Sequence, residues 1–192
     1  MSAVMMEKRY SIEDYLALED KADSKSEYYE GEIFPTAGGT LNHNQISINL
    51  CIILGIAFKK RDFRVFAGDV KLHIPATNSF TYPDVLVING EPSYWQNRRD
   101  TIDKSELIIE ILSDSTKDYD RAGKFENYRS LPELHDYILI SQDKVHIEHF
   151  EKQAFNQWLL TEYKLLDDSL KLVQIEERMS LGDIYDKIVF EK

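Results

Sequence analysis

Two carboxylates stand inside apolar, strand-like runs of the sequence. Asp84 lies in the run Tyr82–Ile88, and Glu110 lies in the run Glu106–Leu112. An ionised carboxylate in an apolar strand is unfavourable unless it is paired or binds a cation. If the two strands are antiparallel neighbours, both acids come to one edge of the sheet. Carboxylate oxygens at that edge suit a hard cation such as Mg²⁺ or Mn²⁺, which can activate water for attack on a phosphodiester.

A positive group beside these acids would orient the attacking water or the phosphate. The helix expected after Glu110 offers Arg121 and Lys124. Lys124 lies on the turn that would face back toward the strand ends, so it is the candidate. The alternative for Lys124 is an exposed helical lysine whose stem covers apolar surface.

The elements that precede these strands begin with a helix over residues 10–20, which Ser11 caps with Asp14 in a capping box. A hairpin is expected over residues 27–34, turning near Glu30 and Gly31. Apolar residues at helical spacing then predict a long helix over residues 42–60.

The rest of the chain is predicted to alternate between strands and helices. Strands are expected at 64–74, 82–88 and 106–112, with a polar surface excursion over 89–104. They are followed by a helix at 122–130, a hairpin of 135–141 with 145–150, a strand at 158–166 and a helix at 180–190. This order predicts an α/β (mixed α+β) fold, a central mixed sheet flanked by helices.

Composition limits the class of protein. The chain has 192 residues, enough for one domain spanning 1–192, and 43% of them are hydrophobic. A net charge of −11 argues against a protein that coats nucleic acid through bulk electrostatics. No apolar run is long enough for a membrane span or a secretory signal. With Cys51 the single cysteine, a reducing cytoplasm is the expected location.

Several short motifs occur in an order that resembles a known family. They are Tyr28-Tyr29-Glu30-Gly31-Glu32-Ile33, His43-Asn44, Ala67-Gly68-Asp69-Val70-Lys71-Leu72, Tyr82-Pro83-Asp84-Val85, Glu110-Ile111-Leu112-Ser113-Asp114-Ser115-Thr116, Asp120, Lys124, Tyr128 and Asp136-Tyr137-Ile138-Leu139-Ile140. Together, over about residues 10–150, they resemble the restriction-endonuclease-like PD-(D/E)XK nuclease superfamily. Within it they are most similar to the Uma-type endonuclease branch, long catalogued as a domain of unknown function.

The resemblance implies roles for particular residues. Asp84 matches the Asp of the PD element, and Glu110 matches the acid of the (D/E)XK element; both would bind Mg²⁺ or Mn²⁺. The sequence departs from the pattern at Leu112, where the family has lysine, and Lys124 is the candidate for that role. A third acid often comes from the first helix or hairpin of the superfamily, and Glu30 is the match, although it could equally be a turn-flanking acid.

Two further residues are secondary candidates. His43 opens the long helix and could approach the site, although a local hydrogen bond at the helix start is the simpler interpretation. Asp69 could contact a metal ligand without binding the metal itself, but a purely structural role is favoured.

These observations predict a Mg²⁺-dependent DNA endonuclease. The alternative is a catalytically degenerate nuclease fold that binds nucleic acid or protein, for which the acidic composition and Leu112 argue. A homodimer is also expected from the resemblance, with an aromatic-rich surface that includes Tyr137, Phe150, Phe155 and Trp158.

Overall fold

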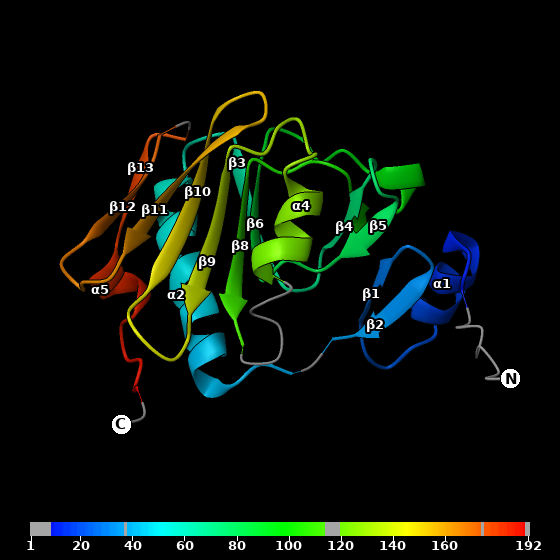
Figure 1. Ribbon diagram of the computed structural model, residues 1–192, viewed down its shortest axis with the longest axis horizontal. Helices are drawn as coiled ribbons and strands as arrows, with labels where there is room; N and C mark the ends of the chain where they lie inside the picture. The colour runs from blue at the N-terminus through cyan, green and yellow to red at the C-terminus, as the bar shows by residue number, and fades with distance from the viewer. Residues whose placement is uncertain (1–8, 37, 114–119, 174, 191–192) are drawn as a thin grey trace, which may run out of the picture.

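Two large β-sheets lie side by side in the molecule, with helices and a separate two-stranded sheet around them (Figure 1). The structure is a computed structural model that describes residues 9–36, 38–113, 120–173 and 175–190. Its helical segments are α1 (Ile12–Glu19), α2 (Leu41–Ala57), η1 (Trp95–Asn97), η2 (Asp120–Lys124), α4 (Phe125–Tyr128) and α5 (Leu181–Ile184). None of the helices in these ranges is both long and apolar enough to cross a membrane.

The larger sheet has six strands in the order β11-β10-β9-β8-β6-β3. Its strands are β3 (Phe63–Ala67), β6 (Val85–Asn89), β8 (Leu107–Leu112), β9 (Asp136–Ser141), β10 (Ile147–Ala154) and β11 (Gln157–Tyr163). The strands β6 and β8 are antiparallel neighbours, as the sequence predicts for the two acid-bearing runs. The strands β8 and β9 are parallel, so η2 and α4 form the crossover between them.

The smaller sheet has five strands in the order β2-β1-β5-β4-β7. They are β1 (Ser26–Tyr29), β2 (Glu32–Pro35), β4 (Lys71–Ile74), β5 (Ser79–Thr81) and β7 (Thr101–Ile102). The helix α1 lies beside this sheet at the far end of the molecule from α5 (Figure 1). Its N-cap is Ser11, which forms a complete capping box with Asp14.

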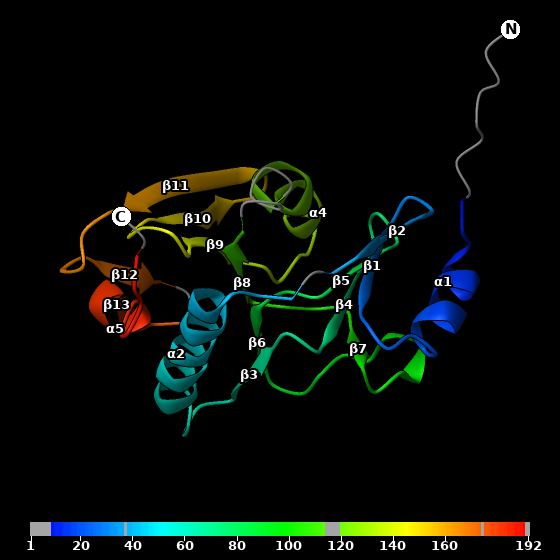
Figure 2. The same ribbon diagram turned by 90° about the horizontal axis from the view of Figure 1, so that it is seen from below.

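The two faces of the six-stranded sheet are covered by different helices. Figure 2 shows α2 and α5 on one side of this sheet and α4 on the other. Along β6, Val85 and Val87 pack in the cluster that contains Leu50 of α2. The alternate residues Leu86 and Ile88 pack in a second cluster, with residues of α4. Since side chains alternate along a strand, the even-numbered positions of β8, which include Glu110, face α4.

The prediction of one strand over residues 64–74 is wrong. The chain passes from β3 in the larger sheet to β4 in the smaller one, and Gly68 at the break has a φ of +59°. The backbone N–H of Gly68 donates to the carbonyl of Asp84, 3.0 Å away. A left-handed residue cannot continue an extended strand, so the run divides there.

The predicted surface excursion over 89–104 is partly wrong as well. It contains η1 and the short strand β7, whose residues Thr101 and Ile102 are buried against β4. The pairing of β7 with a strand thirty residues earlier is a tertiary contact, which local sequence patterns do not reveal.

The C-terminal part differs from the prediction in length and type. The expected helix over 180–190 is only the four-residue α5, and the side chain of its N-cap residue Ser180 makes no capping hydrogen bond. Before it stands an unpredicted hairpin of β12 (Ser169–Leu172) and β13 (Glu177–Ser180). Leu170 and Met179 from this hairpin are buried in the α2 side of the core. The predicted mixed α/β class, with sheets flanked by helices, is nonetheless confirmed.

Candidate active site

Asp84 is fixed at the start of β6 by a backbone hydrogen bond from the neighbouring strand. The N–H of Ile111 donates to Asp84 Oδ2 over 2.7 Å. This bond ties Asp84 to the residue next to Glu110, and its side chain keeps 22% of its surface exposed. One carboxylate oxygen is therefore anchored, while the side chain remains accessible.

Glu110 lies in the middle of β8 and is almost fully buried. Its Oε1 accepts a hydrogen bond of 2.7 Å from the hydroxyl of Tyr128 on α4. The oxygen of the same hydroxyl lies 3.0 Å from Thr81 Oγ1 at the end of β5, where it can accept the Thr81 hydroxyl proton. Tyr128 thus joins the two sheets at the acid.

Lys124 ends η2, and its ammonium group is surrounded by carboxylates. Its Nζ lies 3.1 Å from Glu27 Oε1, 3.2 Å from Glu110 Oε1 and 3.4 Å from Asp120 Oδ1. The Lys124 side chain is only 9% exposed, so the alternative of an exposed helical lysine is wrong. Arg121 on the same turn pairs with Glu148 instead, at 2.7 Å.

The third acid of this cluster is Glu27 and not Glu30. Glu30 is exposed in the turn between β1 and β2, with a φ of +49°, and its carbonyl accepts from Arg9. Glu27 is 7% exposed on β1, and its Oε1 accepts the N–H of Tyr82 over 3.2 Å. The signal that singled out Asp84, an acid inside an apolar strand-like run, is absent at Glu27, which follows Lys25 and Ser26.

The two secondary candidates have different outcomes. His43, in the first turn of α2, places Nε2 3.2 Å from Asp84 Oδ1, so it does reach the site. Thr40 caps that helix by accepting the N–H of His43. Asp69 is exposed and pairs with Lys25 at 2.9 Å, away from the described cluster. The motif residues 114–116 lie outside the described residues.

Excess negative charge governs the electrostatics of the cluster. Burial raises the pKa of Glu110 well above its usual range. The charge of Lys124 lowers this pKa, but the charges of Asp84, Asp120 and Glu27 raise it further. Burial lowers the pKa of Lys124, but Glu110, Glu27 and Asp120 outweigh it and raise the pKa overall. Both shifts favour one more positive charge in the site, whether a proton or a cation.

His43 responds to the same surplus charge. Burial lowers the pKa of its imidazole, but the hydrogen bond and charge of Asp84, together with the charge of Asp120, raise it above its ordinary value. The shift favours the protonated ring, which is a counter-ion to Asp84 from the α2 side.

The donor chemistry of Asp84 and Glu110 fits a hard divalent cation. Both offer carboxylate oxygens, and one oxygen of each is already oriented by an N–H or O–H donor. Within the described ranges, no three His, Cys, Asp or Glu side chains are placed to hold a metal ion. The two carboxylates would share the ion with water or phosphate oxygens, as is usual for Mg²⁺.

The comparisons with known proteins agree with this fold. A crystal structure described as a putative nuclease belonging to DUF820 from Anabaena variabilis matches with a TM-score of 0.76. The match covers 92% of this chain and 98% of that one at 17% identity, so it shows a shared fold alone.

Two proteins of Synechocystis sp. are similar in sequence, and both are described as uncharacterized. The protein sll1609 is 39% identical over 162 residues, which are 84% of this chain and 92% of that protein. The protein slr1290 is 34% identical over 184 residues, which are 95% of this chain and 94% of that protein. The sequence profile of the Uma2 family, described as "Putative restriction endonuclease", matches residues 12–181. The resemblance seen in the motifs is therefore confirmed, and the chain belongs to the Uma2 family.

Proposed function

We propose that this chain is a DNA endonuclease that uses Mg²⁺ or Mn²⁺ to hydrolyse phosphodiester bonds. The observation that carries the proposal is the convergence of three side chains from separate elements. Lys124 Nζ lies 3.2 Å from Glu110, and the backbone beside Glu110 donates to Asp84. A carboxylate paired with an amine, and a second carboxylate bonded to the next residue of the strand, are the functional groups of a PD-(D/E)XK site, here with the lysine on a helix.

Each residue has a distinct task in the proposed reaction. Asp84 and Glu110 hold the cation, which when bound supplies a Lewis acid and a water of lowered pKa. Lys124 donates to the attacking water or to a phosphate oxygen, and so stabilises charge that develops on the phosphate. Glu27 forms an ion pair with Lys124 and keeps its amine on the Glu110 side. Burial of the cluster strengthens each of these interactions.

The test is cleavage of supercoiled plasmid with Mg²⁺ or Mn²⁺ by the wild type and three variants. We expect Asp84→Asn, Glu110→Gln and Lys124→Gln each to lower the cleavage rate by about 100-fold or more, because each removes a group that stabilises the transition state. Asp69→Asn is the matched control, since Asp69 is exposed on the surface and pairs with Lys25. Cleavage that persists in Asp84→Asn and Glu110→Gln would contradict these assignments.

The alternative is a degenerate nuclease fold that serves as a binding module. Such a protein would bind nucleic acid or another protein with no divalent cation at Asp84 and Glu110. The buried Lys124 at 3.2 Å from Glu110 argues for a complete site. A wild type that binds DNA but leaves plasmid intact with both metals would favour the module.

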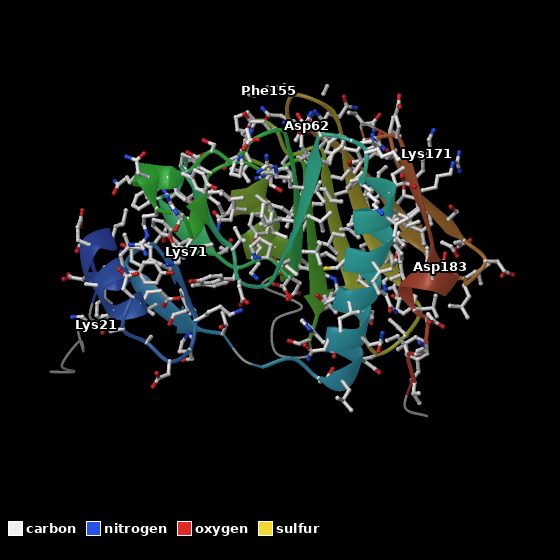
Figure 3. All side chains as sticks on the ribbon, turned by 180° about the vertical axis from the view of Figure 1, so that it is seen from behind. Lys21, Asp62, Lys71, Phe155, Lys171 and Asp183 are labelled. Carbon is white, nitrogen blue, oxygen red and sulfur yellow. The ribbon has the colours of Figure 1, made fainter. Side chains whose placement is uncertain are left out.

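We also propose that the enzyme acts as a homodimer, but through a different surface from the aromatic strands. Tyr137 is fully buried and cannot contribute, whereas Phe155 is exposed at the tip of the β10–β11 hairpin (Figure 3). A broader apolar face lies on α2, where Ile48, Ile52 and Ile56 recur every fourth residue and are 54–71% exposed. The helix contains no Asp, Glu, Lys or Arg, so two copies of this acidic chain could meet there without repulsion.

A further inference from the structure

Lys124 needs neighbouring groups that hold its side chain in place. A lysine on the strand itself, two residues after Glu110, would not need them. Leu112 takes the position two residues after Glu110, and Lys124 reaches Glu110 from a helical turn fourteen residues along the chain. A long, flexible amine that is more than nine-tenths buried must be held in direction by its neighbours. The following inference concerns how this is done and rests on the proposed nuclease function.

The turn that carries Lys124 is a π-helical segment anchored at its first residue. The segment η2 runs from Asp120 to Lys124, and π-helical turns are rare and concentrate at functional sites. The hydroxyl of Tyr137 on β9 donates to the carbonyl of Asp120 over 2.9 Å. The Tyr137 ring also stacks on Phe125, just after the turn, with centroids 5.5 Å apart. The start and end of the turn are thus both fixed to β9.

The Asp120 side chain is buried, and it interacts with Lys124 through charge and not through a hydrogen bond. It is 3% exposed, and its Oδ1 has no hydrogen-bond partner among the described residues. That oxygen nevertheless lies 3.4 Å from Lys124 Nζ, within ion-pair distance but outside hydrogen-bond geometry. A buried carboxylate with an unsatisfied oxygen is unfavourable, so the nearby ammonium is what makes it tolerable.

Asp120 also differs from the two proposed metal ligands. Asp84 and Glu110 each accept a hydrogen bond of 2.7 Å that fixes one carboxylate oxygen. The free oxygen of Asp120 is instead directed at Lys124. We propose that Asp120 is a positioning residue that acts through Lys124, aiming its ammonium group at Glu110, and that it does not bind the metal.

The test combines Asp120→Asn with Lys124→Gln in a double-mutant cycle. In the wild-type background we expect Asp120→Asn to lower kcat for plasmid cleavage about tenfold, within the range for groups that support an active-site residue. The KM for DNA and the calorimetric affinity for Mn²⁺ should stay within twofold. In the Lys124→Gln background, Asp120→Asn should change kcat less than twofold, because the residue through which it acts is gone. Glu126→Gln is the control, because Glu126 lies on the following helix α4 and its side chain is 74% exposed. This variant should change neither kcat nor the affinity for Mn²⁺.

Two results of these kinetic and binding measurements would overturn the proposal. One is a tenfold or greater loss of Mn²⁺ affinity in Asp120→Asn, which would make Asp120 a metal ligand. The other is an equal loss of kcat in both backgrounds, which would show that Asp120 acts independently of Lys124.

Urea unfolding separates this proposal from the proposed function, because it needs no activity. Asp120→Asn should lower the unfolding midpoint where Lys124 is present and raise it in Lys124→Gln, where Asp120 would otherwise be buried unpaired. Equal shifts in both backgrounds would contradict the positioning role. A wild type that cleaves no DNA would contradict the nuclease function and leave this coupling to be decided by the midpoints.

Discussion

At the scale of single residues, burial distinguishes Glu27 from Glu30 in the N-terminal hairpin. Glu27 is buried 3.1 Å from Lys124, whereas Glu30 is exposed in the turn three residues later. We predict that Glu27→Gln lowers the plasmid cleavage rate about tenfold or more, since it removes a charge that orients the catalytic amine. Glu30→Gln is a control of the same chemistry in the same hairpin and should stay within twofold. The reverse order of effects would restore Glu30 as the third acid.

The sequence singles out Asp84, Glu110 and Lys124 as candidates because each leaves a local signal. Two are acids in apolar strands, and the third faces back toward the strand ends from the following helix. Glu27 was missed because a position beside a hairpin turn looks solvent-exposed until β1 is placed against the rest of the sheet. The contact of His43 with Asp84 likewise depends on how α2 docks, which local sequence does not determine.

At the scale of elements, two glycines with opposite environments test the break between β3 and β4. Gly68 has a φ of +59°, whereas a methyl group added at Gly55, inside α2, would meet no heavy atom within 4 Å. We predict that Gly68→Ala lowers the free energy of unfolding by about 1–2 kcal/mol, because alanine is strained in the left-handed region. Gly55→Ala should raise it by about 0.5–1 kcal/mol through helix propensity. Urea denaturation measures both, and equal effects would contradict the assigned conformations.

The strand β4 also carries a histidine that makes stability depend on pH. The ring of His73 packs within 4.9 Å of Phe80 and Trp95, and both ring nitrogens lack a hydrogen-bond partner among the described residues. Burial lowers the pKa of His73, so the folded state holds the neutral ring where the unfolded chain would already be protonated. Its contribution to stability is therefore complete above the unfolded pKa of about 6.5 and is lost as the pH falls through the folded value.

The corresponding experiment compares thermal unfolding at pH values on either side of this range. We predict that the wild type loses more stability between about pH 7.5 and 5 than His73→Phe, which keeps an aromatic ring with no group to protonate. An unchanged pH dependence in the variant would show that His73 is not buried in its neutral form.

The elements predicted best are those with complete local signals. The capping box of α1, the Glu30-Gly31 turn and the apolar spacing of α2 all indicated elements close to the observed bounds. The strand 64–74 and the helix 180–190 failed because tertiary contacts decided them. β3 and β4 join different sheets, and the unpredicted β12–β13 hairpin occupies part of the core beside α5.

At the scale of the whole molecule, the mixed fold could be predicted from element order, but its division into two sheets could not. The site lies where the sheets meet, with Glu27 and Thr81 from one and Glu110 from the other. Sequence patterns indicate each strand without its partner, so the meeting point became visible only in the structure. That the chain forms one domain over 1–192 stays a prediction.

Substitutions on the exposed apolar face of α2 test whether the protein self-associates there. Ile52 lies at the centre of the apolar face formed with Ile48 and Ile56. In sedimentation velocity we predict a dimer for the wild type and a monomer for Ile52→Lys, because a buried unpaired charge would oppose the contact. Phe155→Ser should remain dimeric. A dimer lost only in Phe155→Ser would move the interface to the β10–β11 hairpin.

Calorimetric titration with Mn²⁺ tests the central claim most directly, because it requires no knowledge of the DNA substrate. The claim is that Asp84 and Glu110 hold a divalent cation beside Lys124. We predict that the wild type binds Mn²⁺, that Asp84→Asn and Glu110→Gln each weaken binding at least about tenfold, and that Lys124→Gln retains it. Absence of Mn²⁺ binding in the wild type would contradict the account. So would Mn²⁺ binding by both acid variants that is as tight as binding by the wild type.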